Sequence, residues 1–242
     1  MIQDVGPLND LSSLNYPITG LAFHPVTGVL YGSTGNAGAT DARLVTINPA
    51  TGLVTLIGLF NAGPVNSGGT PTTMADIAFD LSGNLYGVAS IGGPNLYSIN
   101  LLTAQATLVG ANGVSTSTTG GGLAINAGLF FGTPTASRFG TYNSGTGAYV
   151  NIANPVKPAG GAYGALDFDE NGILYGLNVG SGSPPPTHLV TINTANGVVT
   201  DLGVSVDSLD AIAFSVVPEP GTLTIFATAG VIGILITARR RK

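Results

Sequence analysis

Cysteine and tryptophan are absent from this 242-residue chain, and charged residues make up only 8% of it. Without cysteine there can be no disulfide, no thiol chemistry and no cysteine-ligated zinc site. Only three basic residues precede Val217, against eleven acidic ones, so that part has a net charge of −8. Because it lacks a basic patch that could meet a phosphate backbone, nucleic-acid binding is not expected.

Sustained helical periodicity is also missing before Val217, and a repeat of short apolar segments takes its place. A typical unit begins with a segment such as Leu21-Ala22-Phe23, passes through a Gly-containing turn to Leu-Tyr-Gly, and continues with Leu-Val-Thr-Ile or a variant of it. A hairpin of the type Asn48 to Gly52 and a last alternating segment complete the unit. The third unit, residues 122–152, is degenerate. Successive units are 56, 46, 43 and 46 residues apart, measured between Phe23, Phe79, Ile125, Phe168 and Phe214.

Each unit is typical of four short strands, and four strands in 40 to 50 residues indicate a propeller blade. The predicted fold is all-β, with residues 1–216 forming a β-propeller-like array of about four full blades. A stacked β-solenoid is the alternative, although its repeats are usually shorter. The recurring aromatic residues are expected to pack between blades rather than to bind a ligand: Phe23, Tyr31, Phe79, Tyr86, Phe168 and Tyr175.

The two ends of the array suggest an incomplete blade. Ile2 to Gly6 is similar to the last strand of a unit, and Asp210 to Phe214 supplies only a first strand. Together they would form half a blade that lacks its two middle strands. The sequence begins without the basic and apolar regions of a secretory signal, so a truncated N-terminus is expected.

The C-terminal residues 217–242 differ from everything before them. Eighteen uncharged residues, 221–238, could form a transmembrane helix of roughly 27 Å, which is long enough to cross a bilayer. They are followed by the basic cluster Arg239, Arg240, Arg241 and Lys242, which should stay cytoplasmic and so place the repeats outside the cytoplasm. An ordinary single-pass anchor is one interpretation of this segment.

The motif Pro218-Glu219-Pro220, a short apolar span and a terminal basic cluster occur in this order, and this order resembles the PEP-CTERM sorting signal. The resemblance covers about a tenth of the chain. It implies recognition and processing by the membrane protease exosortase. The protein would be held transiently in the inner membrane by its C-terminal helix and then released to the cell surface or the extracellular space.

Few residues suggest catalysis. His24 and His188 lie in no metal-binding pattern and are expected at the surface. Asp167, Asp169 and Asn171 superficially match a calcium loop, but a hairpin turn closed by Asn171-Gly172 explains them better. The repeat motif also weakly resembles propellers of the NHL and gluconolactonase-like kind. Enzymes of the latter kind hold a metal in the central channel, where this chain offers only Asp76, Asp167 and Asp210 as scattered candidates.

The sequence therefore predicts a non-enzymatic, exported protein without cofactor or metal, structural or adhesive in the extracellular matrix or biofilm of a bacterium. Its expected partners are exosortase and either exopolysaccharide or other matrix proteins. Two alternatives remain: a metal-dependent lactonase or hydrolase that uses the propeller channel, and a permanently membrane-anchored binding module.

Overall fold

The computed structural model describes residues 6–35, 39–60, 73–89, 93–111, 113–114 and 121–215. These residues form four antiparallel sheets of four strands each, and no helix. The first sheet contains β1 (Ile18–Phe23), β2 (Leu30–Thr34), β3 (Arg43–Ile47) and β4 (Val54–Leu59). The second contains β5 (Met74–Phe79), β6 (Leu85–Ala89), β7 (Leu96–Ile99) and β8 (Ala106–Gly110). The third contains β9 (Gly122–Asn126), β10 (Leu129–Thr133), β11 (Phe139–Tyr142) and β12 (Tyr149–Ala153). The fourth contains β13 (Ala162–Phe168), β14 (Leu174–Val179), β15 (Thr187–Ile192) and β16 (Val199–Val204).

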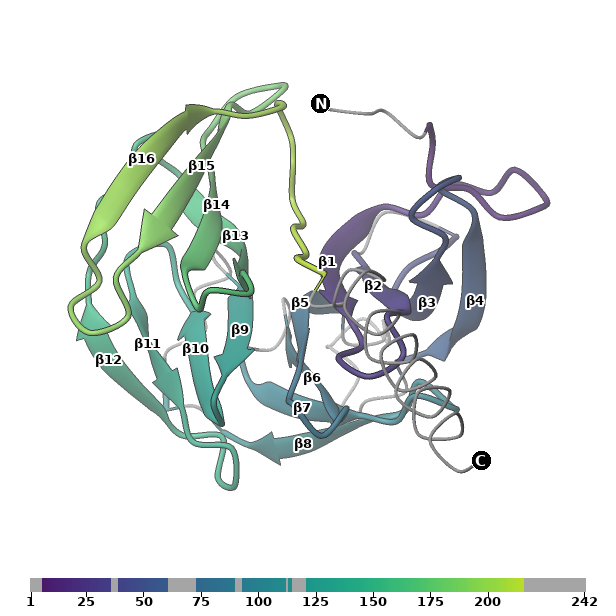
Figure 1. Cartoon of the computed structure of the whole chain (residues 1–242), viewed down its shortest axis with the longest axis horizontal. Coiled ribbons are helices and arrows are strands. Elements are labelled where there is room, and N and C mark those ends of the chain that lie inside the picture. The colour runs from purple at the N-terminus through teal and green to yellow at the C-terminus, as the bar shows by residue number, and fades with distance from the viewer. Residues whose placement is uncertain are drawn as a thin grey trace, which may run out of the picture.

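Each sheet is a meander in which every strand pairs with the next one along the chain. The first strands, β1, β5, β9 and β13, contact one another in succession around a common axis, and the fourth strands lie outermost (Figure 1). The molecule is therefore an all-β propeller of four blades, numbered 1 to 4 in chain order, and the predicted four-stranded repeat is confirmed.

Apolar side chains cover the faces through which neighbouring blades meet. Separate buried clusters fill the spaces between blades 1 and 2, blades 2 and 3, and blades 3 and 4. The predicted inter-blade role of the aromatic residues is confirmed: the ring centroids of Tyr31 and Phe79 are 5.3 Å apart, and those of Phe131 and Phe168 are 5.6 Å apart.

One β-bulge recurs in all four blades, between the third and the fourth strand. The extra residue of the bulge is Ile57 in blade 1, Val109 in blade 2, Ile152 in blade 3 and Leu202 in blade 4. A bulge increases the local twist and bends the strand. Because the bulge falls at the same place in every repeat, each residue at the end of one outer strand has a counterpart in the other three outer strands.

The last described segment, residues 210–215, occupies a fifth position next to the axis. The Phe214 ring lies 4.8 Å from that of Tyr175 in β14, and Ala213 packs against the cluster on the outward face of blade 1. Figure 1 shows this segment, in yellow, running inward from β16 towards β1. The predicted innermost strand therefore takes the expected place, although it pairs with no neighbour as a strand.

The tail of the chain, residues 216–242, lies outside the described residues, and with it the predicted helix 221–238. Within the described ranges, no helix has the length and the apolar character needed to cross a bilayer.

Candidate functional site: the propeller axis and its mouth

The first strands of the blades approach one another so closely at the axis that most of them carry small residues there. Asp76 occupies the same position in blade 2 as Gly20, Gly122 and Ala165 in the other blades. A Cβ added to Gly20 would lie only 2.7 Å from the Asp76 Cα. There is thus room for a single longer side chain at this level, and that side chain is a carboxylate.

Asp76 is fully buried and joins three blades. Its Oδ2 accepts hydrogen bonds from the backbone N–H of Leu123 in β9 (2.9 Å) and of Leu166 in β13 (3.0 Å). Its Oδ1 accepts one from Ile77 N–H (2.9 Å). Innermost strands have one unpaired edge, and the carboxylate satisfies donors on three of these edges. Burial raises the pKa of Asp76 well above its usual range, against the three hydrogen bonds, which lower it.

Asp167 performs a similar task one layer nearer the surface. Its Oδ2 accepts a hydrogen bond of 2.6 Å from Phe214 N–H, and its Oδ1 accepts one from Phe168 N–H. This residue therefore fastens segment 210–215 to blade 4. Burial raises the pKa of Asp167 to about 7, and the charge of Asp167 in turn raises the pKa of Asp76. Burial also raises the pKa of Asp210, the third predicted axis carboxylate.

A pocket of about 230 Å³ opens at the mouth of the axis, where the first strands end. It combines half-buried aromatic rings with carboxylate and amide groups. The residues most relevant to binding are Phe23, Phe79, Asn126, Asp167, Glu170 and Phe214. Such a lining, largely apolar with a few hydrogen-bonding groups, is typical of a small-molecule or sugar site.

Two further carboxylates at this mouth, Asp80 and Asp169, stabilise turns. Asp169 accepts hydrogen bonds from the N–H groups of Asn171 (3.0 Å) and Ile173 (2.8 Å), and Gly172 follows with a φ of +75°. Asp80 binds its own turn in the same way, through Ser82 and Asn84. The interpretation of Asp167 to Asn171 as a hairpin turn is confirmed. Among the residues that the structure describes, no three His, Asp or Glu side chains are grouped as a metal site would require.

Both histidines are partly exposed at the surface, as predicted, and each makes local contacts. His24 packs on the Phe79 ring at 4.9 Å, and its Nδ1 accepts hydrogen bonds from Val26 N–H and Thr27 N–H. His188 pairs through Nδ1 with Asp201 Oδ2 at 3.0 Å. The two partners are thirteen residues apart on β15 and β16, and no motif in the sequence indicates such a cross-strand pair.

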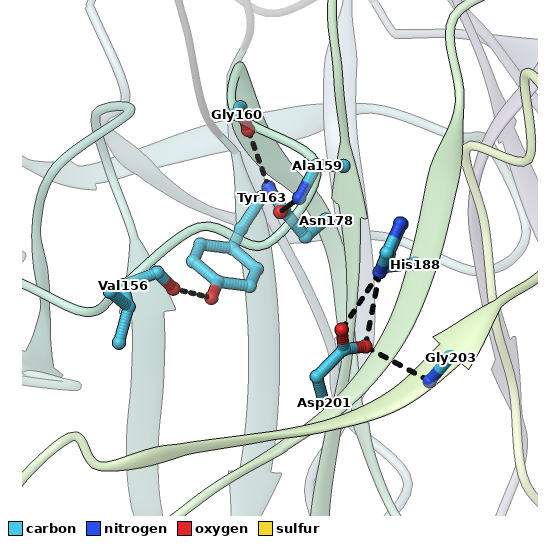
Figure 2. Close-up of polar contacts among 8 residues, drawn as sticks. All are labelled: Val156, Ala159, Gly160, Tyr163, Asn178, His188, Asp201 and Gly203. Carbon is cyan, nitrogen blue, oxygen red and sulfur yellow. Dashed lines mark hydrogen bonds and ion pairs between the residues drawn. The ribbon is translucent and has the colours of Figure 1, made fainter.

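Blade 4 also holds a buried amide close to this pair (Figure 2). The Asn178 Oδ1 accepts from Ala159 N–H at 2.8 Å, and its Nδ2 donates to the carbonyl groups of Gly160 and Ala162. Tyr163 donates to the Val156 carbonyl at 2.5 Å. These bonds fix the connection between blades 3 and 4 and leave no reactive group there.

The sorting-motif residues Pro218, Glu219 and Pro220 and the basic cluster Arg239, Arg240, Arg241 and Lys242 lie outside the described residues. Of the predicted axis carboxylates, Asp76 of blade 2 and Asp167 of blade 4 lie close enough to interact electrostatically. Asp210 lies in segment 210–215, next to Gly164 of blade 4.

The fold and this axis define a β-propeller, and comparison with known proteins agrees. The chain belongs to a family described as a repeat of unknown function (DUF6923), whose model matches residues 10–183. No match is found among curated proteins.

Two solved structures share the fold at low sequence identity. One is a gluconolactonase from Xanthomonas campestris, with a TM-score of 0.52 and 12% identity, over 86% of this chain and 68% of that one. The other is a protein of unknown function from Bacteroides thetaiotaomicron, with a TM-score of 0.51 and 15% identity, over 81% of this chain. The match spans about half of that second protein, 48% of its length. At these identities the likeness concerns the fold alone.

Proposed function

We propose that this protein is an exported, non-enzymatic binding protein of the bacterial cell surface. Its propeller holds a neutral polysaccharide of the extracellular matrix at the mouth of the axis. The C-terminal residues 217–242, with the motif Pro218-Glu219-Pro220, serve as a PEP-CTERM signal that exosortase recognises and removes. In this account a transmembrane helix over 221–238 holds the chain in the inner membrane only until processing.

The observation that carries the proposal is how the carboxylates of the axis are used. Asp76, Asp80, Asp167 and Asp169 all accept hydrogen bonds from backbone N–H groups, so they act as structural acceptors. The groups left to meet a ligand are the exposed Glu170, Asn126 and the edges of the phenylalanine rings. Acceptors and a donor beside apolar rings suit a ligand rich in hydroxyl groups, and they need no basic residue.

The proposal predicts that the purified chain is retained on exopolysaccharide isolated from the matrix of the producing bacterium. Replacing Asn126 and Glu170 together by alanine should weaken this binding at least about tenfold, because one hydrogen bond to a charged group contributes about 1.5–3 kcal/mol. The matched control is Asp207→Asn, an exposed acidic residue away from the pocket. Circular dichroism checks that both variants are folded.

Equal retention of the double variant and the control would contradict a site at the mouth. No retention of the unmodified chain on any matrix fraction would contradict the matrix role itself.

The competing function is a metal-dependent lactonase or hydrolase that works at the same mouth. It predicts turnover of δ-lactones that depends on added calcium, together with a rise of the melting temperature on calcium addition. The binding proposal predicts neither effect. The anchored alternative predicts the same binding but an exported protein that still has the mass of its tail.

A further inference from the structure

Neighbouring blades meet through one repeated contact. The end of each outer strand rests on the hairpin between the third and fourth strands of the next blade. A Cβ on Gly58 of blade 1 would lie 2.9 Å from the Thr103 carbonyl oxygen of blade 2, and one on Gly110 of blade 2 would collide with the Thr146 carbonyl of blade 3. Ala153 of blade 3 meets Gly197 of blade 4 in the same way.

Blade 1 receives this contact too, from the beginning of the chain. A Cβ on Gly52 in its hairpin would lie 3.0 Å from the Pro7 carbonyl oxygen and 3.5 Å from that of Gly6. Gly6 ends the segment that is similar in sequence to the last strand of a unit. Gly6 and Pro7 therefore contact the hairpin of blade 1 at the place where the other hairpins receive the end of an outer strand.

Among the described residues, no contact of this kind is made by the outer strand of blade 4. Gly203, the counterpart of Gly58 and Gly110, would have nothing within 4 Å of an added Cβ. The bulge residue Leu202 is 51% exposed. Of its counterparts, Ile57 and Val109 pack into the clusters between blades, and Ile152 is 37% exposed. Val204 and Val206 beside it are 71% and 67% exposed.

This face keeps the bulge register of the other blades, although Gly203 has a φ of +112° and Gly58 and Gly110 do not have a positive φ. Asp201 Oδ1 accepts a hydrogen bond of 2.9 Å from Gly203 N–H, and its carboxylate pairs with His188, as Figure 2 shows. The hydrogen bond from Gly203, and then the pair with His188, lower the pKa of Asp201, so both fit its charged form. The bulge is thus held in place although no neighbouring blade supports it.

In the position between blade 4 and blade 1, segment 210–215 fills the innermost place, and Gly6 and Pro7 fill the outermost end. In each complete blade, two antiparallel strands lie between these places, as β2 and β3 do between β1 and β4. What fits is therefore a hairpin of two strands whose inner face is apolar and whose last turn carries Gly or Ala.

We propose that the face of blade 4 formed by Leu202, Gly203, Val204 and Val206 binds a two-stranded β-hairpin that completes a fifth blade. The hairpin follows the pattern of this chain's own middle strands, Leu-Tyr-Gly and then Leu-Tyr-Ser-Ile. It packs on the bulge of β16 and lies between segment 210–215 and Gly6. The contact that it makes is the one already present three times between consecutive blades of the molecule.

The test supplies such a hairpin in the correct register. A copy of residues 84–104, which contains β6 and β7, is joined ahead of Met1 of the full chain. The number of residues between the copy and Gly6 then equals the number between residue 104 and Gly110. In the control extension, the copies of Leu85, Leu96 and Ile99 are serine. The chain has no cysteine, so Leu202→Cys gives a single site for labelling with a maleimide. Val109→Cys, made separately, reports a position that is already covered.

With the apolar hairpin, the labelling of Leu202→Cys should slow at least about tenfold and the melting temperature should rise by about 5 °C or more. The serine extension should change neither, and Val109→Cys should label slowly in every case. Equal labelling of Leu202→Cys with and without the apolar hairpin would overturn the proposal. So would a dimer of the unextended chain in which Leu202→Cys is already protected, because a second copy would then cover the face.

Discussion

Asp76 is the residue that joins the blades at the axis. Blades pack on one another mainly through apolar side chains. These side chains fix the distance between two first strands but not their relative position along the propeller axis. The Asp76 carboxylate adds this information, because it bonds at once to β5, β9 and β13. The partners in β9 and β13 lie 47 and 90 residues further along the chain, so the bonds form only when the ring of blades is assembled.

Replacing Asp76 by alanine should lower the free energy of unfolding by about 3 kcal/mol or more. Three buried N–H groups would lose their acceptor, and each such loss costs about 1–3 kcal/mol. Asp76→Asn keeps one acceptor oxygen and resembles the protonated acid that burial favours, so it should cost less than half as much. Urea denaturation of both variants measures the difference, and equal losses would contradict the hydrogen-bonding role.

Asp167 should make the stability depend on pH in an unusual direction. Its pKa is about 7 in the folded protein and near 3.8 in the unfolded chain, so unfolding releases a proton between these values. Stability is therefore greatest near pH 4, falls as the pH rises towards 7, and levels off above it. The total loss should be about 2–4 kcal/mol, since each pKa unit corresponds to about 1.4 kcal/mol.

Asp167→Asn keeps an acceptor for Phe214 N–H and cannot ionise. Melting temperatures measured from pH 4 to pH 8 should fall less for this variant than for the unmodified chain, since the variant still contains Asp76 and Asp210, whose pKa values burial also raises. A parallel fall in both proteins would show that another group is responsible.

At the scale of the strands, the blades adhere through the ends of their outer strands as well as through their clusters. Gly110 has an ordinary backbone conformation, and a Cβ there would strike the Thr146 carbonyl of the next blade. A glycine is needed at that position because of its neighbour and not because of its own turn. Ala153, in the corresponding place of blade 3, carries a methyl group that lies against Gly197 of the next hairpin.

Gly110→Ala should accordingly destabilise the protein by about 1–3 kcal/mol, the usual cost of overpacking. Gly145→Ala is the matched control, since its nearest atom, the Asn143 Oδ1, would lie 3.6 Å away and its backbone is not in the left-handed region. This control should stay within about 0.5 kcal/mol of the unmodified chain. Thermal unfolding measures the loss of stability in both variants. Equal losses would contradict a stabilising role for the contact between Gly110 and Thr146.

The elements themselves could be predicted from the sequence because each repeat carries its own signals. The Leu-Tyr-Gly strands recur in blades 1, 2 and 4, and the hairpin glycines with positive φ, such as Gly52 at +72°, recur in blades 1, 3 and 4, so these signals reinforce one another. The axis could be predicted only in part. Asp76 and Asp167 were candidate channel residues, but their roles depend on N–H groups of other blades, which no local pattern reveals.

The pair of His188 and Asp201 was missed for a related reason. It joins two strands across a bulge, and the register of a bulged strand cannot be read from alternation alone. The same bulge places Leu202 on the face of blade 4 that we propose binds a β-hairpin. The contacts that the repeat pattern does not predict are thus made by single residues next to β-bulges.

At the scale of the whole molecule, the propeller and its tail have different tasks in this account. The repeats form an acidic array with few charges and a largely apolar pocket at one end of its axis. The tail is apolar and basic, and we propose that it determines where the array is delivered. The role in the matrix depends on that delivery, because a polysaccharide of the matrix is met only outside the cell.

The intact mass of the protein made from its own chromosomal copy tests this delivery most directly. Cells are separated into cytoplasmic, membrane and extracellular fractions, and the protein is recovered from each with an antibody against the repeats. The account predicts an extracellular form that retains the repeats and lacks the mass of the residues after Pro218-Glu219-Pro220. A protein found only in the cytoplasm, with residues 221–242 still attached, would contradict it.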